Sequence, residues 1–142
     1  MPTISLSDNF LDALADLDGA DARRVARFLA KLVRAPVTGA LHPEIVHDAA
    51  DRTVRSLRVT HDMRAIVHVN GDAWLLLFVA RHDRAYAWAR DHCIECGPSG
   101  IAATLVAVDD GSGRPIVAMP CESVDDLCRT LDKAGIAHDI VV

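Results

Sequence analysis

The sequence predicts an α+β protein: an N-terminal helical hairpin packed on an antiparallel sheet, a short helix after the last strand, and a C-terminal ββαβ extension. Three observations support this prediction. Apolar residues recur at helical spacing between residues 7 and 34, and three strand-like stretches between 53 and 81 have links too short for parallel crossovers. The composition then changes after Cys96. A length of 142 residues with 51% hydrophobic residues suits one globular domain with a substantial core.

The N-terminal third is expected to contain a short strand and two helices. Residues 3–6 are strand-like, and Ser7 then stands where a helix N-cap belongs. The first helix is expected to end at Gly19. A second helix is predicted over residues 21–34, and Ala35-Pro36 stops it because the residue before proline disfavours helical geometry.

The middle of the chain predicts an antiparallel meander. The strand candidates cover residues 53–60, 63–70 and 73–81, joined by His61-Asp62 and by Asn70-Gly71-Asp72. Asn-Gly and Gly-Asp are strong hairpin signals, so neighbouring strands are expected to be antiparallel. The third strand runs directly into a helix predicted over residues 83–92.

Turn length then predicts which side chains share a face. If each link is a two-residue hairpin, Arg55, Arg64 and Arg81 gather on one face around aliphatic residues. Trp74 and Phe78 lie on the other face, which we expect beneath the helical hairpin. A three-residue turn in either link would reverse this assignment.

Residues 97–142 form an acidic appendage. The stretch contains a predicted hairpin around Asp110–Gly113, a helix over residues 124–134 capped by Ser123, and a last strand in "HDIVV". Residues 93–142 have 3 Lys and Arg against 8 Asp and Glu, whereas residues 1–92 have 12 of each sign. We therefore expect a neutral domain over residues 1–96, and an acidic unit over 97–142 that packs on it or stands apart.

The totals favour a cytoplasmic protein without a cofactor. No apolar stretch approaches the roughly 18 residues of a membrane span, and the N-terminus lacks the pattern of a signal peptide. The four cysteines are expected to be free thiols, with Cys121 and Cys128 in the core. Cys93 and Cys96 leave zinc open as a minor alternative, but no second C-x-x-C accompanies them.

Three segments, "LHPE", "RSLRVTHDMRAIVH" and "LLLFVARHDRAYAWA", follow the helical hairpin in order. Together they resemble the RelE/ParE toxin superfamily, most closely the RelE-type domain at the N-terminus of some UvrD-like bacterial helicases. The resemblance covers about residues 3–92 and implies a RelE-like fold. It also implies a bacterial toxin–antitoxin function, in which an mRNA interferase cleaves message on the ribosome. An antitoxin or a helicase is the implied protein partner.

The same resemblance implies a site at the end of the meander. Arg64 takes the place of the family's middle-strand Arg, His82 that of the basic residue before the last helix, and Tyr86 that of the C-terminal Tyr. Arg55 and Arg58 are looser matches to a phosphate-binding pair, although their alternation in a strand allows only one of them in a given site.

Elementary chemistry agrees with these roles. An imidazole can accept or donate a proton near neutral pH, a phenol four residues later on a helix lies close to it, and Arg64 and Arg81 offer forks for phosphate oxygens. Ordinary structural roles are also open: His82 as a solvated edge residue, Arg64 in an ion pair with Asp62, and Trp88 in the core.

Three functions follow from these residues. The first is a ribosome-associated endoribonuclease in which a ribose 2′-hydroxyl attacks the adjacent phosphate. The second is a non-catalytic interaction module, accessory to a helicase or another nucleic-acid enzyme. The third, gyrase inhibition as in ParE-type toxins, has no distinguishing residue. The acidic residues after position 96 are further predicted to shield the basic face.

Overall fold

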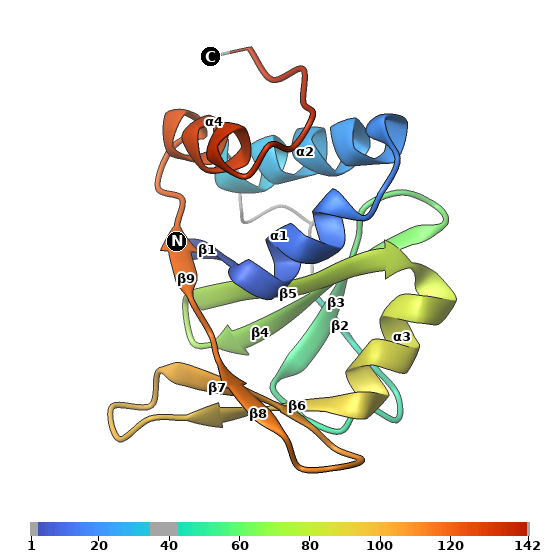
Figure 1. Ribbon diagram of the computed structural model, residues 1–142, viewed down its shortest axis with the longest axis vertical. Helices are drawn as coiled ribbons and strands as arrows, with labels where there is room; N and C mark the ends of the chain where they lie inside the picture. The colour runs from blue at the N-terminus through green and yellow to red at the C-terminus, as the bar shows by residue number, and fades with distance from the viewer. Residues whose placement is uncertain (1–2, 35–42, 142) are drawn as a thin grey trace.

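The computed structural model describes residues 3–34 and 43–141 (Figure 1). The described elements are four helices, a mixed six-stranded sheet and a small three-stranded sheet. In chain order they are β1 (Thr3–Ser7), α1 (Asp8–Ala15), α2 (Gly19–Arg34), β2 (Glu44–Ile45), β3 (Val54–Arg58), β4 (Met63–Asn70), β5 (Ala73–Arg81), α3 (His82–Asp91), β6 (His92–Cys96), β7 (Ala102–Ala107), β8 (Gly113–Pro115), β9 (Ala118–Pro120) and α4 (Val124–Lys133).

The helical hairpin begins as predicted. The Ser7 hydroxyl accepts the backbone N–H of Phe10 at 2.9 Å and caps α1. Asp18 does the same for α2, accepting the N–H of Asp21 at 2.7 Å, so α2 starts at Gly19 rather than at residue 21.

The main sheet has the strand order β2-β3-β4-β5-β1-β9. The predicted meander β3–β4–β5 is antiparallel, but β1 pairs in parallel with β5, so the prediction of an antiparallel sheet is wrong for the sheet as a whole. The chain between β1 and β5 includes two helices and the meander, which is long enough for the crossover that parallel neighbours need.

The prediction that Arg55, Arg64 and Arg81 share one face is also wrong. Arg58 pairs with Arg64, so the loop between β3 and β4 is longer than two residues. The longer loop reverses which side chains of β3 lie on each face, as expected for a turn that is not a two-residue hairpin. The turn after Asn70 has the predicted register, but a bulge then shifts the pairing between Ile66 and Val67. Arg81 therefore alternates onto the opposite face from Arg64.

Both faces of the main sheet are covered. The larger core joins α1 and α2 to one face, where Phe10 and Leu29 pack with Val67, Trp74 and Leu76. The smaller core lies on the other face, under α3, and its buried members include Ile66, Leu75, Leu77, Ala85 and Ala89. Phe78 contacts both cores, because the bulge displaces it from the face on which it was predicted.

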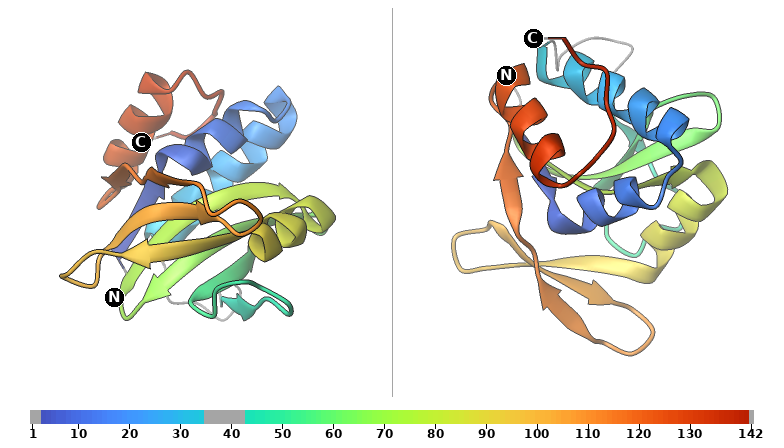
Figure 2. Two further views of the ribbon diagram at one scale, coloured as in Figure 1. Left: turned by 60° about the horizontal axis from the view of Figure 1, so that its bottom comes forward. Right: turned by 45° about the horizontal axis from the view of Figure 1, so that its top comes forward.

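The C-terminal segment contributes to both sheets. β6, β7 and β8 form the small sheet, whereas β9 pairs with β1 at the edge of the main sheet. α4 lies beside α2 (Figure 2), and Leu127 and Leu131 enter the larger core. His92, predicted as the last residue of a helix, instead begins strand β6, which runs to Cys96.

The predicted last strand does not form over residues 138–141, which have no strand geometry; residue 142 lies outside the described residues. Asp139 instead pairs with Arg27 of α2 at 2.5 Å, and the carbonyl of Val141 accepts from Arg34. The segment runs along a helix, where no strand is available to pair with it. The extension is therefore not ββαβ.

Within the described residues, no helix is both long enough and apolar enough to span a membrane.

Candidate functional site

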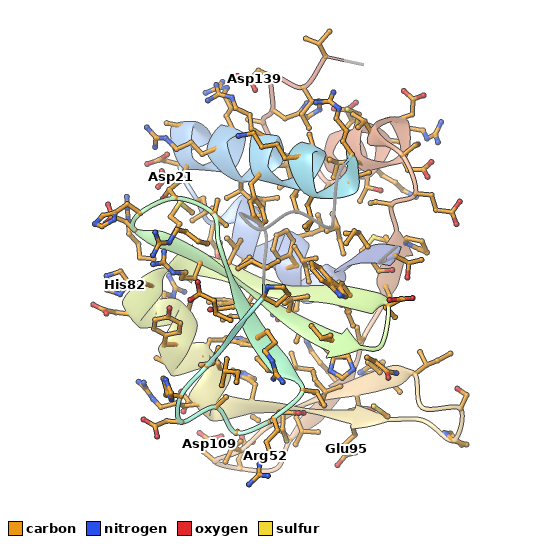
Figure 3. The ribbon with its side chains drawn as sticks, turned by 180° about the vertical axis from the view of Figure 1, so that it is seen from behind. Asp21, Arg52, His82, Glu95, Asp109 and Asp139 are labelled. Atoms are coloured by element: carbon orange, nitrogen blue, oxygen red, sulfur yellow. The ribbon has the colours of Figure 1, made fainter. Side chains whose placement is uncertain are left out.

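The predicted site lies where β5 passes into α3. Arg81 ends the strand and His82 opens the helix, without a side-chain cap. The backbone N–H of His82 donates to the carbonyl of Asp62 at 2.8 Å, which ties the β3–β4 loop to this junction. Figure 3 shows His82 at the outer end of α3.

His82 and Tyr86 lie side by side on α3. Their ring centroids are 6.4 Å apart and the rings are tilted by 50°. Nδ1 of His82 lies 2.8 Å from the Asp83 carboxylate, and the imidazole is about half exposed. A proton held on Nδ1 by Asp83 leaves Nε2 free to accept a proton from a bound molecule.

Arg58 and Arg64 are direct cross-strand partners on the face that α3 covers. Arg64 also pairs with Ala80, two residues before His82, so it lies close to the strand–helix junction. Its Nη1 donates to three carbonyls of the β3–β4 turn, those of Thr60 at 2.9 Å, His61 at 3.1 Å and Met63 at 2.9 Å. Arg64 therefore stabilises the turn through these hydrogen bonds. Arg58 is exposed.

Arg81 does not join this group. Its guanidinium lies 3.3 Å from Asp21 and 3.5 Å from Asp62, and Asp21 also pairs with Arg24 at 2.7 Å. Asp62 therefore pairs with Arg81, and the alternative of an Arg64–Asp62 pair does not occur.

Arg55 is also separate, because its Nη1 donates to the carbonyls of Arg52 and Val54 in the loop before β3. Of the predicted residues, His82, Tyr86, Arg64 and Arg58 therefore lie at one end of the sheet. Arg81 lies at the same end but on the opposite face, and Arg55 lies further along β3.

An aromatic stack beside the site was not predicted. Phe78 stacks on Trp88 with centroids 5.1 Å apart, and Trp88 stacks on His92 at 4.3 Å. The Arg84 guanidinium also lies over the Phe78 ring, 6.0 Å from its centroid. Trp88 was assigned to the core and is half-buried. The four-residue spacing of Arg84, Trp88 and His92 could have indicated that these side chains lie along one side of the helix.

The cysteines divide into two pairs. Cys121 and Cys128 are buried, as predicted, and burial raises the pKa of each thiol. Cys93 and Cys96 lie on β6 as free thiols. Across residues 3–34 and 43–141, no three His, Cys, Asp or Glu side chains are placed to hold a metal ion together.

Comparisons with known proteins give a distant likeness at the level of structure. No family model matches the sequence, and no curated protein matches it significantly. Among solved structures, a copper-bound mutant toxin from Helicobacter pylori superposes with a TM-score of 0.41 and 16% identity, over 59% of this chain and 98% of that one. A likeness at this level does not indicate which residues act, or on what substrate.

Proposed function

We propose that the chain is a RelE/ParE-like, toxin-type endoribonuclease. The observation that carries this proposal is the His82–Tyr86 pair, with rings 6.4 Å apart, at the end of the sheet where Arg58 and Arg64 are paired. An acid–base pair beside two guanidinium groups suits cleavage of a phosphodiester.

The proposed reaction needs no group beyond these side chains and the RNA itself. Nε2 of His82 accepts the proton of a ribose 2′-hydroxyl, and the 2′-oxygen bonds to the adjacent phosphorus. The bond from phosphorus to the 5′-oxygen breaks, and that oxygen takes a proton from Tyr86. The products are a 2′,3′-cyclic phosphate and a 5′-hydroxyl. Arg58 and the free edge of Arg64 stabilise the charge on the phosphate oxygens.

Charge supports ribosome-bound message as the substrate. Residues 1–92 have 12 basic and 12 acidic side chains, so the domain has little long-range attraction for free RNA. A message already held and positioned by the ribosome removes that requirement.

The test is expression of the chain in bacteria, followed by growth measurement and mapping of new 5′ ends in message. We expect growth arrest and cleaved message. His82→Ala with Tyr86→Phe should lower cleavage at least about 100-fold, the usual contribution of general acid–base catalysis. His47→Ala, in the exposed loop before β3, is the matched control and should cleave like the wild type. Intact message with the wild-type chain, or full activity in the double variant, would refute the proposal.

A non-catalytic interaction module is the second candidate, and the arginines favour it. Arg81 is held by two carboxylates and Arg64 by three carbonyls, so both have structural roles. In this case the wild type leaves message intact but binds RNA or a helicase, and Arg58→Ala weakens binding while His82→Ala does not. Nothing in the site favours gyrase inhibition.

A further inference from the structure

A chain of three polar side chains lies apart from the site described above. The Thr53 hydroxyl donates to Oδ1 of Asp51 at 2.6 Å, and the Thr53 backbone N–H donates to the same oxygen at 2.9 Å. Oδ2 of Asp51 accepts the backbone N–H of Ile94 in β6 at 2.9 Å. The Thr53 hydroxyl oxygen lies 2.8 Å from Nδ1 of His68 in β4. Three segments hold these side chains in place: the loop that precedes β3, strand β4 and strand β6.

These contacts fix the protonation of His68. A hydroxyl group has one proton, and that of Thr53 is directed at the Asp51 carboxylate, so its oxygen must accept from His68. Nδ1 of His68 is then protonated, and Nε2 has a free lone pair. Burial lowers the pKa of His68 and the nearby Asp51 carboxylate only partly offsets this effect, so the ring is neutral near neutral pH.

Nε2 of His68 is a buried atom without a partner. Only 4% of the residue is exposed, and Nε2 has no hydrogen-bond partner within the described parts of the chain. An unpaired buried polar group costs about 1–3 kcal/mol, and such groups are rare in folded proteins. The position of this atom therefore indicates a place where a further molecule binds.

His68 is one of the residues that line a cavity of about 130 Å³. Ser5, Leu75 and Ala118 line it from the main sheet, and Ile101, just before β7, and Ala102 of β7 line it from the small sheet. The wall is mainly apolar. Ile101 is 68% exposed, so it can move aside to admit a ligand. An apolar cavity of about 150 Å³ in another protein binds benzene, which sets the size class.

We propose that this cavity binds a small, uncharged molecule of about the size of benzene, whose single hydroxyl or N–H group donates to Nε2 of His68. The apolar wall favours a hydrocarbon framework, and the lone pair requires a donor. An anion is disfavoured, because the lone pair of Nε2 would repel it and the lining residues include no Lys or Arg.

Phenol and toluene are matched probes, since they have nearly the same size and differ in the hydroxyl group. The full-length, isotope-labelled chain is titrated with each, and the His68 ring and Ile101 methyl signals are followed by NMR. We expect phenol to bind at least about tenfold more tightly than toluene, because one hydrogen bond contributes about 1–1.5 kcal/mol. Equal affinities, or no saturable binding of either probe, would overturn the proposal.

Two variants locate the binding. Ala102→Leu fills the cavity and should abolish the saturable phenol shifts, whereas Ala103→Leu, at the exposed neighbouring position, should keep the wild-type affinity. Thr53→Val removes the hydroxyl that orients His68, so it should reduce the preference for phenol without closing the cavity. Phenol binding that survives Ala102→Leu would exclude this cavity. No readout uses RNA, so the result is independent of the proposed nuclease activity.

Discussion

Two histidines show how surroundings alone give one residue type different roles. His82 is exposed, and its Nδ1 contacts the Asp83 carboxylate. His68 is buried and contacts a threonine hydroxyl, and the missing solvent holds its pKa below the ordinary value of about 6.5. His82 therefore presents its imidazole to solvent beside a carboxylate, whereas the buried ring of His68 favours the neutral form.

The lowered pKa of His68 predicts a loss of stability in mild acid. The unfolded chain takes up a proton near pH 6.5, but the folded chain takes it up only at lower pH. The free energy of unfolding should therefore fall as pH decreases through this interval, by up to about 1.4 kcal/mol per pH unit. Urea unfolding from pH 7.5 to 5 measures this slope.

Substituting His68 should remove that part of the slope. His68→Gln keeps a hydrogen-bonding side chain without a titrating group, so its stability should depend less on pH over the same range. His47→Gln, at an exposed position, should keep the wild-type slope. If His68→Gln and the wild type have the same slope, this account of the histidine is wrong. Burial raises the pKa of Asp51, but its hydrogen bonds lower it more, so the pKa is lowered overall. Asp51 therefore affects stability only below about pH 3.8.

At the scale of elements, the sequence predicts the features that depend on residues close together in the chain. The N-caps Ser7 and Ser123, the Asn70-Gly71 turn and the start of α3 all depend on residues within a few positions, and all were placed correctly. The longer β3–β4 loop, the bulge near Leu77 and the pairing of β1 depend on distant contacts. Because these contacts could not be predicted, Arg81 was predicted on the wrong face. For the same reason, Arg58 was not recognised as the cross-strand partner of Arg64.

The two serine caps should differ in their contribution. Ser7 is fully buried and its hydroxyl accepts from Phe10, whereas Ser123 is exposed and accepts from Asp126 at 3.1 Å. We expect Ser7→Ala to lower the free energy of unfolding by about 1–2 kcal/mol and Ser123→Ala by about 0.5–1 kcal/mol. Chemical unfolding midpoints at constant slope measure both. Ser99→Ala, in an exposed turn, is the control, and an equal loss at Ser7 and Ser123 would contradict the prediction.

At the scale of the whole molecule, the C-terminal segment completes the core. Leu127, Leu131 and Ile136 are buried against the N-terminal helices and strands. Among the ion pairs of the described residues, Asp139 meets Arg27, Asp126 meets Arg129 and Asp132 meets His138. None of them reaches Arg58 or Arg64, so shielding of the basic face stays a prediction.

Truncation should therefore unfold the protein rather than expose a surface. Three buried aliphatic side chains contribute on the order of 5 kcal/mol, comparable with the total stability of a domain. A chain ending at residue 112 should lose cooperative unfolding and bind hydrophobic dyes. A chain ending at residue 136 keeps α4 and Ile136, and should unfold cooperatively at a somewhat lower temperature. A cooperative transition with an unchanged midpoint in the shorter chain would show that residues 1–112 fold without α4, which would contradict the prediction.

The position of β1 has a consequence for biosynthesis. This strand is translated well before its neighbours, which are residues 73–76 of β5 and 118–120 of β9. One edge of β1 therefore stays open until β5 has left the ribosome, and the other until about residue 120 has done so. Because such distant pairings form slowly, the nascent chain contains an unpaired strand throughout the synthesis of the segment between them, in the state where chaperones are most useful.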